Sequence, residues 1–167
     1  KNTKEISRSH KIIVSDNGLV TITGGKWPSY RLMAEDTVDK AIEVCGLPKR
    51  KCVTKKFRIH GYRKNPDLTD HMYVYGSDEP KILQLIEKEP ALGEKLSEKF
   101  GYTLAEVVWA VREEMAITLE DVLARRVRLL FVDAREAIAA APKAAAIMAR
   151  ELGRDQAWID EQVKSFT

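Results

Sequence analysis

The stretch GGKWPSYR, residues 24–31, joins a short apolar run to a long amphipathic segment. The apolar run, residues 19–23, is β-prone, and Pro28 suits the first turn of a helix, where its missing N–H would have no partner anyway. Two glycines at this junction let the backbone adopt conformations closed to other residues and approach a ligand closely. The stretch therefore predicts a sharp strand-to-helix turn that carries Lys26.

The segments on either side of this turn predict a hairpin and a helix. Residues 11–15 and 19–23 are β-prone runs joined through Asp16-Asn17-Gly18, a sequence that favours a tight turn. After the turn, an apolar stripe with helical spacing ends at Gly46, and Pro48 lies just beyond. We therefore expect a hairpin plus a helix in residues 1–46.

The rest of the chain predicts a helical domain with its own core. Residues 47–76 look irregular, with one strand expected around residues 52–59, and from Ser77 onward the pattern is helical. Capping boxes are indicated at Thr103 and Thr118. The fold class is therefore mainly α, with a helical domain in residues 47–167. Further helices are expected at residues 90–100, 134–152 and 155–166, and a buried helix face at Leu119, Val122, Leu123, Val127, Leu130 and Phe131.

Composition excludes several classes of protein. With 167 residues, 44% hydrophobic and 32% charged, the chain has the composition of a soluble globular protein, and no apolar run approaches the roughly 20 residues that span a bilayer. A net charge of +3 is too mild to indicate nucleic-acid binding by itself. Two cysteines and three scattered histidines lack the spacing of a metal site. We expect a reduced, metal-free intracellular chain.

The glycine-lysine turn has two interpretations on its residues alone. The first N–H groups of a helix are unpaired and carry partial positive charge, and Lys26 adds a full charge at the same place, which favours an anion site. The spacing is not that of the nucleotide-triphosphate loop GxxxxGK[ST], so Mg–ATP is not expected. The alternative is a tight turn with a solvated lysine.

Four blocks resemble the C-terminal part of FAD-dependent glycerol-3-phosphate dehydrogenases. SRSH at residues 7–10, GLVTITGGKWPSYR at 18–31 and MAED at 33–36 follow that family's pattern SR-x-H, GL-x-TI-x-GGKWTTYR-x-MAED. TLEDVLARRVRLLFVDAR at residues 118–135 resembles the signature of its helical C-terminal domain. The blocks occur in the family's order. The chain is identified on these blocks as the C-terminal portion of such an enzyme.

The resemblance implies an activity and a set of site residues. The family oxidises sn-glycerol 3-phosphate to dihydroxyacetone phosphate, passing hydride to FAD and electrons on to quinone. Gly24 and Gly25 would lie along the flavin, and Lys26 would face flavin and substrate, stabilising negative charge on the reduced flavin. Arg8 would hold the substrate phosphate through charge-assisted hydrogen bonds. Trp27 would pack on the flavin or fill the hinge between strand and helix.

Some positions depart from the family's pattern or call for another interpretation. Pro28 and Ser29 stand where the family has two threonines, which puts a flavin contact by that side chain in doubt. No acid–base partner is evident near His10, so we interpret it as structural. Three arginines of the helical signature are expected to form ion pairs and solvated helix surface: Arg125, Arg126 and Arg128.

The glycine-rich motif with which the family binds the ADP half of FAD is missing from the 167 residues. No GxGxxG follows a strand, so residues 1–46 are expected to be the tail of an FAD/substrate domain, and the chain alone should be inactive. A calcium loop of the form DxDxDG is also missing, which favours a bacterial enzyme over the calcium-regulated mitochondrial type. We expect a cytoplasmic location, with room for peripheral binding at the inner face of the cell membrane.

Other functions stay open on the sequence. A glycerophosphate oxidase that uses oxygen would share these residues, and a non-catalytic helical interaction module is the alternative from another class. Residues 49–64 hold eight basic and no acidic side chains, with Phe57 and Tyr62 among them. No nucleic-acid motif accompanies this run, so no nucleic-acid partner is expected. The run has two interpretations, a positively charged connector packed beside the flavin domain and a surface that binds an anionic membrane. The sequence leaves a homodimer open.

Overall fold

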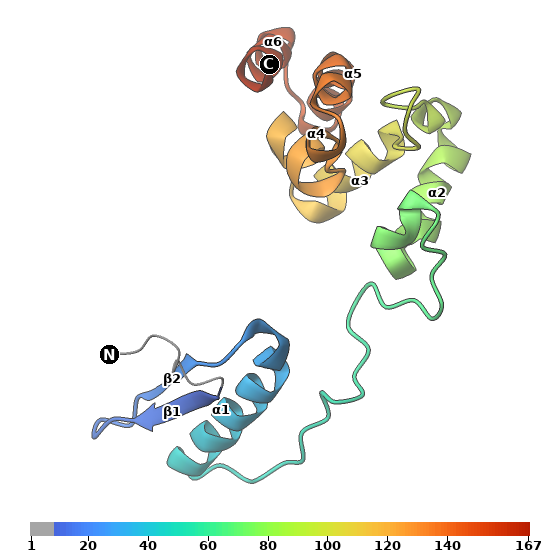
Figure 1. Ribbon diagram of the computed structural model, residues 1–167. Helices are drawn as coiled ribbons and strands as arrows, with labels where there is room; N and C mark the ends of the chain where they lie inside the picture. The colour runs from blue at the N-terminus through green and yellow to red at the C-terminus, as the bar shows by residue number, and fades with distance from the viewer. Residues whose placement is uncertain (1–8) are drawn as a thin grey trace, which may run out of the picture. The chain divides into compact units, whose positions relative to one another are not determined.

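The computed structural model describes residues 9–167 and divides the chain after Ile59 into two compact units. The first unit holds a two-stranded antiparallel hairpin and one long helix, and the second is helical (Figure 1). This architecture confirms the predicted fold class, a mainly helical chain in which a hairpin precedes the helical domain. The elements of the first unit are β1 (His10–Val14), β2 (Val20–Gly24), the 3-10 turn η2 (Trp27–Ser29) and α1 (Tyr30–Val44).

The hairpin forms where the sequence predicts it. In its register His10 lies opposite Gly24, and Val14 lies opposite Val20. The backbone N–H of Gly18 donates to the carbonyl of Ser15 at 2.8 Å, and Gly18 has φ = +83°. Because positive φ costs glycine little, this residue lets the chain reverse tightly between the strands.

The helix α1 also matches the prediction at both ends. Pro28 lies in η2, the turn that leads into α1. At the other end the N–H of Cys45 donates to the carbonyl of Ala41, and Gly46 follows with φ = +62°. A left-handed glycine just past the last turn is a common way to end a helix.

The prediction of a strand around residues 52–59 is wrong. The structure gives these residues turns and irregular backbone, and within residues 9–167 the only sheet is the β1–β2 hairpin. A strand needs a neighbour to pair its backbone N–H and C=O groups, and this run has none there. Val53, Phe57 and Ile59, the residues behind the prediction, are exposed. The units divide after Ile59 rather than after residue 46, and the assignment of either part to a domain of a larger protein stays a prediction.

The second unit encloses a single apolar core. Helix α5 runs through it as predicted and packs against α3, α4 and α6. Most side chains on its buried face are alanines, which let the neighbouring helices approach closely. The elements of this unit are η3 (His71–Asp78), α2 (Glu79–Lys88), η4 (Pro90–Gly93), α3 (Leu104–Glu114), the π-helical turn η5 (Asp121–Arg126), α4 (Leu129–Val132), α5 (Ala134–Leu152) and α6 (Gln156–Phe166).

Two helical predictions in this unit fail. The helix expected at residues 90–100 ends at Gly93, because the following backbone pairs with the segment before α3: Leu96 N–H donates to the carbonyl of Tyr102 at 2.8 Å. Phe131, expected in the core, is 73% exposed. Arg128 has φ = +63°, which breaks the helical phase, so that Leu129 is buried instead.

A buried carboxylate ties η3 to the start of α3. Glu106 closes the predicted capping box by accepting from the N–H of Thr103 at 2.7 Å, and only 1% of the residue is exposed. Its other carboxylate oxygen accepts from the hydroxyl of Tyr75 at 3.0 Å, and His71 Nε2 lies 3.2 Å from the oxygen that caps Thr103. The hydrogen bond to Glu106 raises the pKa of His71, against the opposing effect of burial. Burial raises the pKa of Tyr75 far above its usual range.

The raised pKa of His71 predicts a pH-dependent stability of the second unit. Protonated His71 faces Glu106 and Asp70, with Tyr102 edge-on to its ring. A group whose folded-state pKa is raised contributes stability that is fully present below its unfolded value, near 6.5, and lost as pH rises through the folded value. Urea unfolding at a series of pH values should show the free energy of unfolding falling across that window.

The control for this pH dependence is His71→Gln. The variant cannot titrate at this position, so the fall in stability above pH 6.5 should be reduced relative to the native chain. An identical pH profile for the two proteins would mean that His71 does not carry the effect.

Candidate functional site

The two glycines of the GGK turn are required by the chain itself. Gly24 and Gly25 have φ = +79° and +77°. A Cβ added to Gly25 would lie 2.7 Å from Met33 Sδ, and one added to Gly24 would lie 3.2 Å from the carbonyl oxygen of Ser9. The backbone conformation therefore disfavours larger residues at both positions, and packing against the Ser9 carbonyl adds to this at Gly24, independently of any ligand.

Lys26 is exposed at the end of this turn, on backbone held by Ser29. The Ser29 hydroxyl donates to the carbonyl of Lys26 at 2.7 Å, and the Ser29 N–H donates to the same oxygen at 2.9 Å. The hydroxyl that remains where the family has threonines thus fixes the backbone that carries the lysine. Sequence reasoning missed this role, although serine three residues into a turn is a common capping arrangement.

Trp27 does not fill the hinge between strand and helix. It is 84% exposed and stacks on Tyr30, with ring centroids 5.5 Å apart and an angle of 24° between the planes. An exposed lysine and a stacked aromatic pair are thus carried by neighbouring positions of the chain on the surface of the first unit. Groups of this kind suit a planar ligand that carries or gains negative charge.

His10 has a partner that sequence reasoning missed. Its Nε2 lies 2.8 Å from a carboxylate oxygen of Asp36 on α1, and its side chain is 15% exposed. Asp36 is the last residue of the MAED block, far from His10 in the sequence, so only the fold brings them together. The expectation that no partner lies near His10 is therefore wrong, whereas its interpretation as a structural residue stays a prediction.

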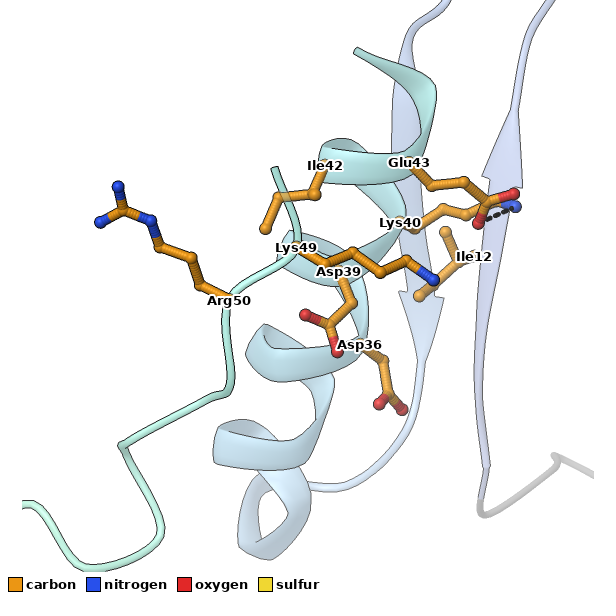
Figure 2. Close-up of a pocket in the computed structure, with 8 residues that line it drawn as sticks. All are labelled: Ile12, Asp36, Asp39, Lys40, Ile42, Glu43, Lys49 and Arg50. Carbon is orange, nitrogen blue, oxygen red and sulfur yellow. Dashed lines mark hydrogen bonds and ion pairs between the residues drawn. The ribbon is translucent and has the colours of Figure 1, made fainter. Parts of the chain in front are cut away.

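Charged side chains surround a small cavity beside α1. The cavity has a volume of about 360 Å³, with acidic groups and Lys40 on α1 and two further basic groups on the segment that follows it (Figure 2). Lys40 and Glu43 form an ion pair at 3.0 Å on its rim. Its mixed charge gives no preference for an anion or a cation. The lining residues are Ile12, Asp36, Asp39, Lys40, Ile42, Glu43, Lys49 and Arg50.

Arg31 fastens the segment after α1 to the helix. Its Nη1 donates to Glu35 at 2.5 Å and to the hydroxyl of Thr54 at 3.1 Å. The hydrogen bond between Arg31 and Glu35 raises the pKa of the arginine and lowers that of the carboxylate. Arg31 is thus engaged within this unit rather than directed to the turn at Lys26.

The remaining arginines differ in their surroundings. Arg8 lies outside the described residues. Arg125 pairs with Asp121 at 2.9 Å and Glu120 at 2.7 Å, which confirms the predicted ion pairs. Arg126 donates to the carbonyl of Glu114. The guanidinium of Arg128 lies over the exposed ring of Phe131, 5.9 Å from its centroid.

Within the described part of the chain, no group of three or more His, Cys, Asp or Glu side chains could hold a metal ion.

None of the helices in residues 9–167 is long and apolar enough to cross a membrane.

Comparison with known proteins gives a consistent set of relatives. The chain is 37% identical to the probable mitochondrial glycerol-3-phosphate dehydrogenase of Caenorhabditis elegans, over 92% of this chain and 24% of that protein. It is 34% identical to the mitochondrial glycerol-3-phosphate dehydrogenase of Rattus norvegicus, over 99% of this chain and 25% of that protein. The chain spans about a quarter of the length of these relatives. Because they are mitochondrial by name, the predicted bacterial source gains no support from them.

The second unit also matches a family model. Residues 52–159 match the model of the C-terminal domain of alpha-glycerophosphate oxidase. The match covers most of the helical unit and includes residues 118–135, the block that carries the resemblance in this part of the sequence. The chain therefore belongs to the family of the C-terminal domain of alpha-glycerophosphate oxidase, and its predicted resemblance to glycerol-3-phosphate dehydrogenases is confirmed.

Proposed function

We propose that this chain is the C-terminal part of an FAD-dependent glycerol-3-phosphate dehydrogenase that oxidises sn-glycerol 3-phosphate to dihydroxyacetone phosphate. The observation that carries the proposal is the exposed Lys26, presented on a glycine turn in a chain whose relatives are named for this activity. Bound FAD would accept the hydride from the substrate. Lys26 would stabilise negative charge on the reduced flavin, with Gly24 and Gly25 shaping the turn and Trp27 offering a flat apolar face.

Burial supports assigning residues 1–46 to the tail of an FAD/substrate domain. Among the described residues of the first unit, no apolar side chain is as buried as those in the core of the second. A groove of about 680 Å³ with a largely apolar lining lies between α1 and residues 50–59 of the same unit. Clefts of this volume with a mostly apolar lining are typical binding sites, and they occur preferentially at domain interfaces. The further length of the relatives would supply the part of the protein that covers it.

Arg8 would bind the phosphate of the substrate, because guanidinium groups form paired, charge-assisted hydrogen bonds with phosphate oxygens.

Quinone is the proposed electron acceptor, and oxygen, as in a glycerophosphate oxidase, is the alternative favoured by the name of the matching family model. A quinone-linked enzyme would gain from peripheral contact with the inner face of the membrane. The exposed basic residues of 49–58 would supply it. Homodimer formation through the helical unit belongs to the same proposal.

The experiment that tests the function compares the 167-residue chain with the full-length protein that contains it. Only the full-length protein should retain FAD through gel filtration, and anaerobic glycerol 3-phosphate should bleach its flavin absorbance. Reoxidation by a soluble quinone or by oxygen then identifies the acceptor. Glycerol, which lacks the phosphate, is the matched control substrate. A flavin-loaded protein that glycerol 3-phosphate fails to reduce would contradict the proposal, as would tight FAD binding by the 167 residues alone.

A further inference from the structure

One side-chain contact joins the three elements that meet at the GGK turn. His10 lies at the start of β1, opposite Gly24 in the ladder, and Asp36 lies on α1. The 2.8 Å contact between His10 Nε2 and Asp36 therefore links the first strand directly to the helix that follows the turn. This polar contact holds β1 and α1 together on either side of the turn.

The turn is packed against His10 and against Met33 on α1. The position that a Cβ would take on Gly25 lies 3.4 Å from His10 Cβ and within contact distance of Met33, one turn before Asp36 on α1. The opposite side of the turn is open, because Lys26, Trp27 and Pro28 are exposed. The position of Lys26 thus depends on the support beneath Gly25.

We propose that His10 and Asp36 are a positioning pair that fixes the GGK turn and with it the location of the Lys26 charge. The proposal rests on the proposed function, in which that charge faces the reduced flavin. The pair acts through the turn, because neither side chain needs to contact a ligand to hold strand and helix together. Misplacing a charge by about 1 Å at a reacting centre can lower the rate by about 100-fold.

The exposure of the pair separates positioning from stability. Asp36 is 42% exposed and also lines the cavity of Figure 2. Because its carboxylate is this open to solvent, the contact contributes little to folding stability, although the His10 side chain is only 15% exposed. Loss of the pair should therefore reduce catalysis without a matching loss of thermal stability, whereas a purely structural contact would show the reverse.

The test uses full-length, FAD-loaded protein carrying His10→Leu, Asp36→Ala or both. We expect kcat per bound flavin to fall about tenfold or more in each, with a smaller change in KM, and the double variant to resemble the singles because both remove one contact. Asp36→Asn, which keeps an acceptor, should recover most of kcat. Asp39→Ala removes a carboxylate from the same helix and cavity and is the matched control.

Two readouts do not depend on turnover. Sulfite addition to the oxidised flavin is favoured by positive charge near the ring, so its affinity should fall in parallel with kcat. In the 167-residue chain, NMR should show the amide resonances of Gly24, Gly25 and Lys26 moving in His10→Leu and staying in place in Asp39→Ala. The proposal would be overturned if His10→Leu and Asp36→Ala kept the kcat and sulfite affinity of the wild type. It would also be overturned if Asp39→Ala lost as much kcat and sulfite affinity as they do.

These readouts also distinguish a failure of the His10–Asp36 proposal from a failure of the proposed function. A wild-type protein that binds FAD but does not oxidise glycerol 3-phosphate would refute the proposed function. The pair would still stand if sulfite affinity and the turn resonances respond to His10 and Asp36 in that protein. If the wild-type protein oxidises glycerol 3-phosphate and the His10 and Asp36 variants show unchanged kcat and sulfite affinity, the proposed function is retained and the positioning role of the pair is rejected.

Discussion

Replacing Lys26 with alanine in the full-length enzyme is expected to lower kcat about 100-fold while raising KM much less. Removing one preorganised group that stabilises developing charge typically costs 10²–10³ in kcat, that is, at least about 100-fold. In the proposed mechanism the charge of Lys26 matters most once the flavin is reduced, so the loss should fall on the transition state rather than on substrate binding. Steady-state kinetics per bound flavin gives both constants.

Two variants show whether this effect belongs to the position and charge of Lys26. Lys26→Arg keeps the charge on the same backbone and should retain part of kcat. Lys11→Ala removes one exposed positive charge from β1, where Lys11 lies opposite Thr23 in the same hairpin, and should leave kcat close to that of the wild type. A Lys26→Ala enzyme with normal kcat would exclude this lysine from the mechanism.

The parts of the fold that could be predicted are those fixed by neighbours in the sequence. Asp16-Asn17-Gly18 carries its own turn chemistry, and the capping box at Thr103 and Glu106 needs only four consecutive residues. The failed predictions depend on distant partners. Residues 52–59 have strand-forming side chains but no strand to pair with among residues 9–167, and residues 94–96 pair with the backbone before α3 instead of continuing a helix.

The candidate site divides in the same way. The GGK turn was predictable because two consecutive glycines between a β-prone run and a helix leave few other conformations. Asp36 as the partner of His10 was not, since the contact depends on how α1 rotates against the hairpin. The exposure of Phe131 was missed because one left-handed residue, Arg128, shifts the phase of a helical pattern that otherwise continues.

In the second unit, Glu106→Ala is expected to lower the free energy of unfolding by about 3 kcal/mol. Truncating one partner of a buried, hydrogen-bonded charge cluster typically costs about 3–5 kcal/mol, because the remaining groups lose their partner in a dry environment. Here the groups left behind are the His71 ring, the Tyr75 hydroxyl and the Thr103 N–H. The lower end of the range applies because His71 is partly exposed and can turn to water.

Urea unfolding of the 167-residue chain, followed by far-UV circular dichroism, measures this loss. Glu106→Gln keeps one neutral acceptor oxygen in place of the two that accept from Tyr75 and Thr103, so it should lose less stability than Glu106→Ala while removing the charge that raises the pKa of His71. Glu113→Ala, an exposed carboxylate on the same helix, is the matched control and should change stability by less than about 0.5 kcal/mol. Equal losses in Glu106→Ala and Glu113→Ala would show that helix α3 tolerates loss of the buried carboxylate, and that the cluster at its start does not hold η3 in place.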